Sequence, residues 1–117
     1  MHRLKYFSPF AFVVVVGCAT GELSAERVTS VVAAIRSADE LGARALPQAA
    51  LHLTLAEEEL AQAKKLAADG DEQRGDTFLE RATADAELAM ALTRLKDAEA
   101  EAMKARQAVA QLEGGAQ

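Results

Sequence analysis

An apolar repeat with alternating steps of three and four residues constrains the fold of this 117-residue chain more than any other feature. Between residues 84 and 112 it places small or aliphatic side chains on one face of a helix. The repeat consists of Ala84, Leu88, Ala91, Leu95, Ala98, Ala102, Ala105, Val109 and Leu112. A repeat of this kind keeps one seam of a helix facing a neighbouring helix. The sequence therefore predicts an all-α fold.

A second stretch with the same rhythm precedes this one. It consists of Leu46, Ala49, Leu53, Ala56, Leu60, Ala63 and Ala67. Pro47 suits the first turn of a helix, because its missing N–H would have no partner there. Gly70 favours a left-handed helix stop, and Asp71 or Asp76 can cap a new helix. We expect helices over about residues 47–69 and 71–112.

A shorter helix is expected over about residues 24–42, with Ser24 as its cap and Gly42 as its stop. Its apolar face consists of Val28, Val31, Val32, Ile35 and Ala38. The third helix has a second stripe in its first half, and we expect helix one to pack where the two stripes overlap, at about residues 84–92. The second stripe consists of Leu79, Ala82, Ala86 and Ala89. The prediction is a helical domain over residues 24–113, followed by a flexible tail over 114–117.

Two arrangements of these helices remain open. In the first, an antiparallel three-helix bundle leaves the last turns of the third helix overhanging. In the second, a long helical hairpin with coiled-coil-like packing places helices one and two end to end against helix three. We expect most of the heptad faces to form the core, and the first arrangement is preferred.

The amino terminus has the layout of a secretory signal. His2, Arg3 and Lys5 give a basic start, and an apolar segment over residues 7–16 follows before polar sequence begins at Thr20. A membrane-spanning helix needs about 20 apolar residues, which this segment does not supply. Residues 1–17 are therefore predicted to be a cleaved signal peptide.

The sequence Val15-Val16-Gly17-Cys18 resembles the lipobox of bacterial lipoproteins. The resemblance implies cleavage between Gly17 and Cys18, acylation of Cys18 and a lipidated tether over residues 18–23. Two or three acyl chains hold a protein stably on a bilayer, whereas one holds it marginally. The alternative is that Cys18 is an ordinary residue near a signal cleavage site or in a short uncleaved anchor.

The expected location is the periplasmic face of the outer membrane. The residue after the cysteine is Ala19 rather than Asp, which by resemblance to lipoproteins of two-membrane bacteria favours export to that membrane. In a source with one membrane, the expected location is the outer face of the cytoplasmic membrane.

Composition narrows the classes of function. Loss of Arg3 and Lys5 with the signal changes the net charge from −5 to −7, which disfavours nucleic acid as a partner. Phe78 is the sole aromatic residue after residue 17, so stacking on bases or sugars is disfavoured. Acylation of Cys18 would leave no thiol for disulfides, catalysis or metal binding. No cofactor and no small-molecule substrate is predicted.

The region from Val28 to Leu112 resembles a bacterial envelope domain, domain of unknown function 4398. The resemblance is carried by residues 34–43, by Pro47 with Leu55-Ala56, by Ala63-Lys64 with Gly70-Asp71, and by residues 81–89. It implies an outer-membrane lipoprotein domain that often precedes a peptidoglycan-binding domain of the outer-membrane-protein-A type. We expect no such domain within the printed residues, so cell-wall binding is not carried over. The family offers no catalytic residues to transfer.

The remaining candidate sites are weak. Asp69, Asp71 and Glu80 fit positions one, three and twelve of a calcium-loop frame, but Arg74 stands where that frame needs glycine. His52 lacks a histidine or carboxylate three or four residues away, so we interpret it as a surface or boundary residue. Three consecutive glutamates, residues 57–59, fan out around a helix and are interpreted as a solvated face.

The sequence therefore predicts a non-enzymatic envelope lipoprotein that acts as a structural or protein-interaction module. Its partner would be another envelope protein or a second copy, bound by the exposed end of the apolar repeat. That candidate surface consists of Ala98, Ala102, Ala105, Val109 and Leu112. The alternative is a small periplasmic module that binds a ligand or calcium through residues 69–80.

Overall fold

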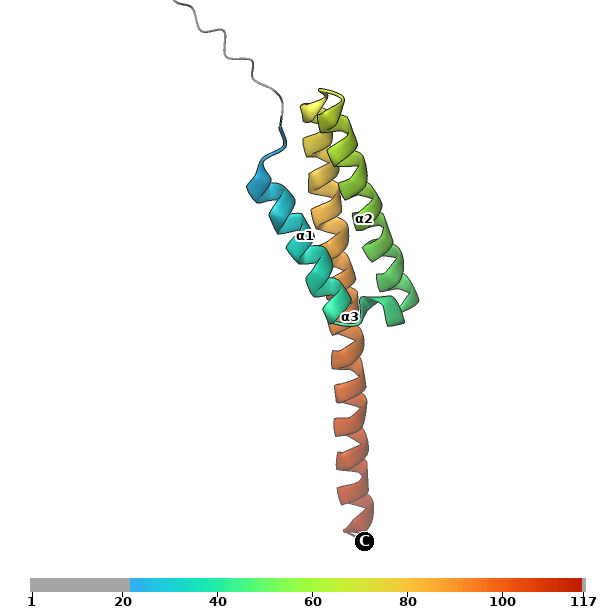
Figure 1. Cartoon of the computed structure of the whole chain (residues 1–117). Coiled ribbons are helices and arrows are strands. Elements are labelled where there is room, and N and C mark those ends of the chain that lie inside the picture. Colours follow the sequence, from blue (N-terminus) through green and yellow to red (C-terminus); the bar gives the residue numbers. More distant parts are fainter. Residues whose placement is uncertain (1–21, 117) are drawn as a thin grey trace, which may run out of the picture.

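The computed structural model describes residues 22–116, which fold into three α-helices and one short 3-10 helix. In chain order these are α1 (Ala25–Glu40), η1 (Ala43–Ala45), α2 (Pro47–Ala68) and α3 (Glu72–Gly115). Figure 1 shows α1 and α2 on either side of the first part of α3, while the rest of α3 extends alone. The predicted bundle with an overhanging third helix is confirmed.

The helices end where the sequence changes backbone preference. Gly42 and Gly70 follow α1 and α2 with φ angles of 88° and 86°, which glycine adopts without a steric penalty. Pro47 occupies the first turn of α2, as predicted. Asp71 caps α3 by accepting a hydrogen bond from the backbone N–H of Arg74 at 3.2 Å. Ser24 takes the cap position of α1, but its side chain makes no capping hydrogen bond.

The core is thin because alanine supplies much of it. One cluster, near the α2–α3 turn, consists of Val31, Leu60, Ala63, Leu79 and Ala82. The other lies near η1 and consists of Ala38, Ala43, Ala49, Leu53 and Ala89. A buried alanine removes little apolar area from water, but it lets two helices approach closely. Stability therefore depends strongly on the few large buried side chains.

Charged side chains link the helices at the edges of this core. Arg27 of α1 lies 2.8 Å from a carboxylate oxygen of Asp76 and 3.3 Å from one of Glu80, both on α3. Arg44 of η1 lies 2.7 Å from both Asp39 and Glu57. The hydrogen bonds that the Arg44 guanidinium donates to Glu57 and then to Asp39 raise the pKa of Arg44. These pairs are exposed, so they contribute little individually.

Helix α3 contains 44 residues and, at about 1.5 Å per residue, is about 66 Å long. Its last buried residue is Thr93, whose hydroxyl donates to the carbonyl of Ala89 at 2.9 Å. Every described residue after Thr93 is exposed. We call residues 94–115 the overhang. The helix continues to Gly115 rather than ending near residue 112, so part of the expected flexible tail is helical.

Candidate functional site

The signal and the lipobox lie outside the described residues. Residues 1–21 include Val15, Val16, Gly17 and Cys18, so the structure does not describe the predicted lipidation site. Within residues 22–116, none of the helices is sufficiently long and apolar to cross a bilayer.

The predicted partner-binding residues are all exposed on the overhang. They are Ala98, Ala102, Ala105, Val109 and Leu112. The exposed apolar stripe is nevertheless longer than predicted, because it begins at Ala84 beside the bundle and not at Ala98. We call the stripe the outer seam. It consists of Ala84, Leu88, Ala91, Leu95, Ala98, Ala102, Ala105, Val109 and Leu112.

The buried stripe of α3 explains why the outer seam stays uncovered. Ala82, Ala86, Ala89 and Thr93 are buried against α1 and α2, and each is followed two residues later by a residue of the outer seam. Two residues correspond to about 200° around an α-helix. The two stripes therefore lie on nearly opposite sides of α3. The expectation that most of the repeat forms the core is wrong for this helix.

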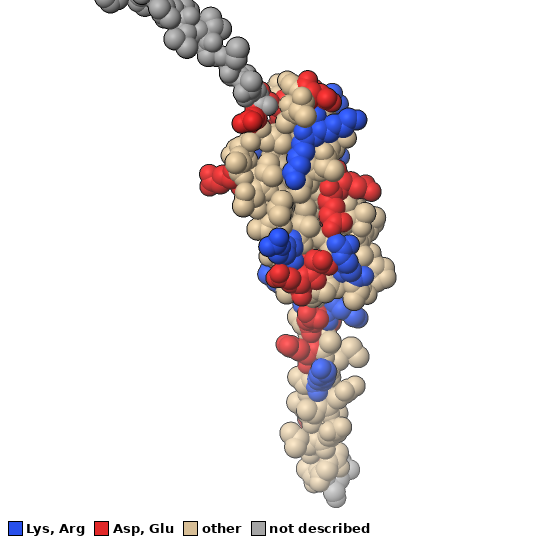
Figure 2. Space-filling model, in the orientation of Figure 1, with Lys and Arg blue, Asp and Glu red and all other residues tan. Residues whose placement is uncertain are grey.

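Large aliphatic side chains of the outer seam are strongly exposed. Leu95 and Val109 are 56% and 53% exposed, Leu112 is 76% exposed, and Leu88, beside the bundle, is 41% exposed. Figure 2 shows charged side chains of both signs over the bundle and mainly uncharged side chains near the end of α3 on the visible face. A soluble helix normally turns such a stripe towards a partner.

A shallow groove between α2 and α3 adjoins the outer seam. The part of this groove beside the bundle is lined by Gln48, Leu51, His52, Leu88 and Leu92. A second depression shares Gln48 and Leu92 with it and extends to Leu95 on the overhang. Leu51 is 58% exposed here although it belongs to α2. The apolar surface is thus widest where the bundle meets the overhang.

A polar cluster along the α2–α3 contact was not predicted from the sequence. His52 Nδ1 lies 2.7 Å from Asp85 Oδ1, and Arg81 Nε lies 3.5 Å from Glu59 Oε1. The side chain of Glu59 is only 13% exposed, so the interpretation of residues 57–59 as a solvated face is wrong for Glu59. The spacing of His52 and Glu59, which are one heptad apart, indicates that they lie on the same face of α2. The sequence could not predict their partners, because these depend on the register of α2 against α3.

Burial dominates the electrostatics of this cluster. Burial first, then the neighbouring carboxyl group of Asp85, raises the pKa of Glu59, while the charge of Arg81 acts in the opposite direction. Glu59 Oε2 has no hydrogen-bond partner among the residues that the structure describes. The groove beside His52 is lined by amide, imidazole and leucine side chains, so it offers the imidazole no hydroxyl, thiol or amine to activate.

The candidate calcium residues are not brought together as a loop. Asp69 ends α2, Asp71 caps α3, and residues from Glu72 onwards are helical. Glu80 instead contacts Arg27. Within residues 22–116 there is no group of three or more His, Cys, Asp or Glu side chains arranged to hold a metal ion.

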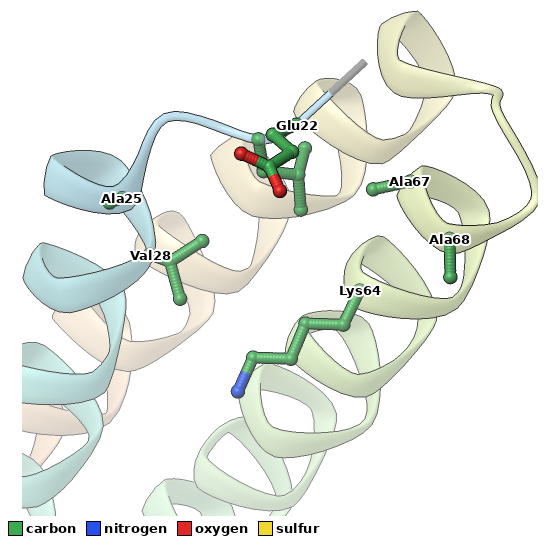
Figure 3. Close-up of a pocket in the computed structure, with 7 residues that line it drawn as sticks. Glu22, Ala25, Val28, Lys64, Ala67 and Ala68 are labelled. Atoms are coloured by element: carbon green, nitrogen blue, oxygen red, sulfur yellow. The ribbon is translucent and has the colours of Figure 1, made fainter. Parts of the chain in front are cut away.

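Another pocket lies at the other end of the bundle, where the described chain begins. Figure 3 shows Glu22, Ala25 and Val28 facing Lys64, Ala67 and Ala68 across an open space between α1 and α2. Alanines line much of the pocket, and Glu22 and Lys64 are its charged residues. The pocket does not gather polar groups that could orient a ligand.

Comparison with known proteins gives one result. No curated protein and no solved structure matches the chain significantly. A family model described as "Domain of unknown function (DUF4398)" matches residues 26–105. That match covers α1, η1, α2 and most of α3, and it agrees with the resemblance seen in the sequence. The chain therefore belongs to the DUF4398 family.

Proposed function

We propose that this chain is a non-enzymatic lipoprotein of the cell envelope that acts as a structural or protein-interaction module. Acyl chains on Cys18 would hold it on the periplasmic face of the outer membrane of a two-membrane bacterium. The observation that carries the proposal is the uncovered outer seam of α3. Its function would be to dock another helical surface along that seam.

The exposed leucines support docking. Leu51, Leu88 and Leu95 are all more than a third exposed and lie around the junction of bundle and overhang. Monomeric soluble proteins rarely leave contiguous apolar patches uncovered unless these bind something. Complete burial of a fully exposed leucine side chain is worth about 1.5–3 kcal/mol, and these leucines, which are 41–58% exposed, forgo about half of that. A partner that covers the seam would recover part of that free energy.

The arrangement of the ends supports an anchored module. The described chain begins at one end of the bundle, and the overhang points away from the other end (Figure 1). A lipid on Cys18, four residues before Glu22, would hold the first end near the bilayer. The outer seam would then extend towards the periplasm, where a partner could reach it.

Lack of a reactive group beside the imidazole supports a non-enzymatic role. His52 and Asp85 form a pair that resembles part of a catalytic triad, but the lining of the adjacent groove supplies no nucleophile. The pair links α2 to α3 and has a sufficient structural explanation there.

Two measurements test this proposal. Mass spectrometry of membrane-extracted protein should find acyl chains on Cys18, and Cys18→Ser should release the protein from the membrane. A photo-crosslinking residue at Val109, on the seam, should give adducts in cells, whereas one at Gln107, two residues away on the opposite face, should not. An unmodified Cys18 in membrane extracts, or equal crosslinking from both positions, would contradict the proposal.

A further inference from the structure

We propose that the outer seam binds a second copy of this chain, with the two α3 helices parallel and in register. This inference rests on the proposed function, since it names the partner of the same surface. Three observations carry it: the pattern of apolar positions, the charges that flank them, and the position of the bundle relative to the seam.

The apolar positions follow the heptad pattern of a two-stranded coiled coil. Counting Leu88 as position a, the a positions are Leu88, Leu95, Ala102 and Val109, and the d positions are Ala84, Ala91, Ala98, Ala105 and Leu112. A seam sustained over four heptads with charges beside it is typical of a coiled coil. Val109 at a with Leu112 at d is the combination that, in parallel coiled coils, favours two strands.

The flanking charges are complementary for a parallel pair. In a parallel coiled coil, position g of one helix faces position e of the next heptad in its partner. Arg94 at g would face Glu99 of the second copy, and Glu101 at g would face Arg106 of the second copy. The two-fold symmetry of the dimer repeats each of these two ion pairs, so the interface has four attractive pairs and no repulsive pair at these positions. All of these side chains are exposed on the overhang.

An antiparallel pair matches the charges less well. The register that pairs Leu95 with Leu112 of the second copy brings Glu99 near Arg106 twice, but it places Glu101 opposite Ala108. That register therefore makes two attractive pairs instead of four. A parallel pair also keeps both amino-terminal ends on the same side, as two copies anchored in one membrane require.

The bundle leaves space for the second copy. Helices α1 and α2 cover the side of α3 that carries Ala82, Ala86 and Ala89, nearly opposite the seam. The second α3 would lie beside the groove that contains Leu51, Leu88 and Leu92. Leu51 would then lose some of its present exposure of 58%. Dimerisation thus accounts for an exposed leucine on α2 as well as for those on α3.

Sedimentation equilibrium tests the association and its charge pattern. The full chain with Cys18→Ser should form a reversible dimer at about 1–100 μM. Glu101→Arg should weaken the dimer about tenfold, because two attractive pairs become repulsive, and adding Arg106→Glu should restore it. A monomer over the whole range, or a dimer that Glu101→Arg leaves unchanged, would overturn the parallel pair.

Disulfide formation tests the orientation. In the same background, which has no other thiol, Leu112→Cys should crosslink to itself, because d positions meet across a parallel seam. In the antiparallel register the two sulfurs would be about 25 Å apart along the axis and would not react. Gln107→Cys, on the outer face, is the matched control. Equal crosslinking of both variants, or none from Leu112→Cys, would contradict the proposal.

Photo-crosslinking in cells separates this inference from the proposed function. An adduct of twice the chain mass from Val109 supports the second copy. Adducts with a different protein alone would overturn the second copy and leave the docking function intact. Absence of any adduct, together with an unmodified Cys18, would remove both.

Discussion

His52 of α2 and Asp85 of α3 meet through a 2.7 Å contact between Nδ1 and Oδ1. The two residues are 33 positions apart in the chain, and both side chains are more than two-thirds buried. The contact joins one position of α2 directly to one position of α3. It also gives Asp85, which lies beside the buried Glu59, a hydrogen-bond partner.

Removing the imidazole should lower stability. We expect His52→Ala to reduce the free energy of unfolding by about 1 kcal/mol at pH 7, because the largely buried carboxylate of Asp85 loses its hydrogen-bond partner. His52→Gln is the matched control, since its amide can donate to Asp85 and should retain part of the stability. Urea unfolding followed by circular dichroism measures both. Equal losses for Ala and Gln would show that the contact itself contributes little.

Glu59 should make stability depend on pH. Its raised pKa means that the folded chain resists ionisation more than the unfolded chain does. The contribution of Glu59 to the free energy of unfolding is therefore fully present below its ordinary pKa of 4.5. It is lost as the pH rises through the raised pKa of the folded state. Glu59→Gln should be more stable than the parent chain at pH 7, and the difference should shrink towards pH 4. Thermal unfolding from pH 4 to 8 measures this, and a difference that grows on acidification would contradict it.

Gly75 should resist even a small side chain. A Cβ at this position would lie 3.0 Å from the carbonyl oxygen of Ala63 and 3.1 Å from Leu23 Cδ2. Alanine would gain about 1 kcal/mol of helix propensity, but a backbone oxygen cannot rotate away, and overpacking costs about 1–3 kcal/mol. We expect Gly75→Ala to lower the free energy of unfolding by about 1 kcal/mol.

The control for this substitution is Gly114→Ala, on the exposed end of the same helix. A Cβ there meets nothing within 4 Å, so the change should be neutral or slightly stabilising. Thermal unfolding of both variants decides the matter. A Gly75→Ala chain that melts above the parent would show that α2 and α3 separate easily.

Leu53 should contribute far more to stability than its neighbour Leu51. Leu53 is fully buried, whereas Leu51, two residues away on α2, is 58% exposed. Leu53→Ala should cost about 2–5 kcal/mol, because the cavity in a thin core has few neighbours to fill it. Leu51→Ala in the monomer should change stability by less than about 0.5 kcal/mol. Similar losses in urea unfolding would mean that Leu51 is covered in solution.

Local sequence signals predicted the helices and their ends well. Pro47, Gly42 and Gly70 act through their own backbone preferences, which depend little on the rest of the fold. The core of α2 was also predicted, since most of its heptad residues are buried: Ala49, Leu53, Ala56, Leu60 and Ala63. That helix has one dominant apolar stripe, so the sequence indicated clearly which of its faces would be buried.

The sequence did not decide which face of α3 is buried. The stripe at Ala82, Ala86 and Ala89 and the stripe at Ala84, Leu88 and Ala91 obey the same rhythm, and alanine fits a core or a surface equally well. The longer stripe was the natural choice, yet the shorter one forms the core. Side-chain contacts between helices could not be predicted from the sequence either. His52 and Asp85 became partners only once the register of α2 on α3 was known.

Because the overhang is one unbroken helix, its length sets the distance between the bundle and the tip of α3. Each heptad inserted into residues 94–115 would extend its reach by about 10 Å and turn the tip by only about 20°. Five inserted residues would add about 7 Å but swing the tip by about 140°. The number of residues in this segment therefore sets two quantities: the distance of the tip from the bundle, and the rotation of the tip about the helix axis. Insertion of whole heptads would change the distance with little rotation, and the bundle itself would need no other change.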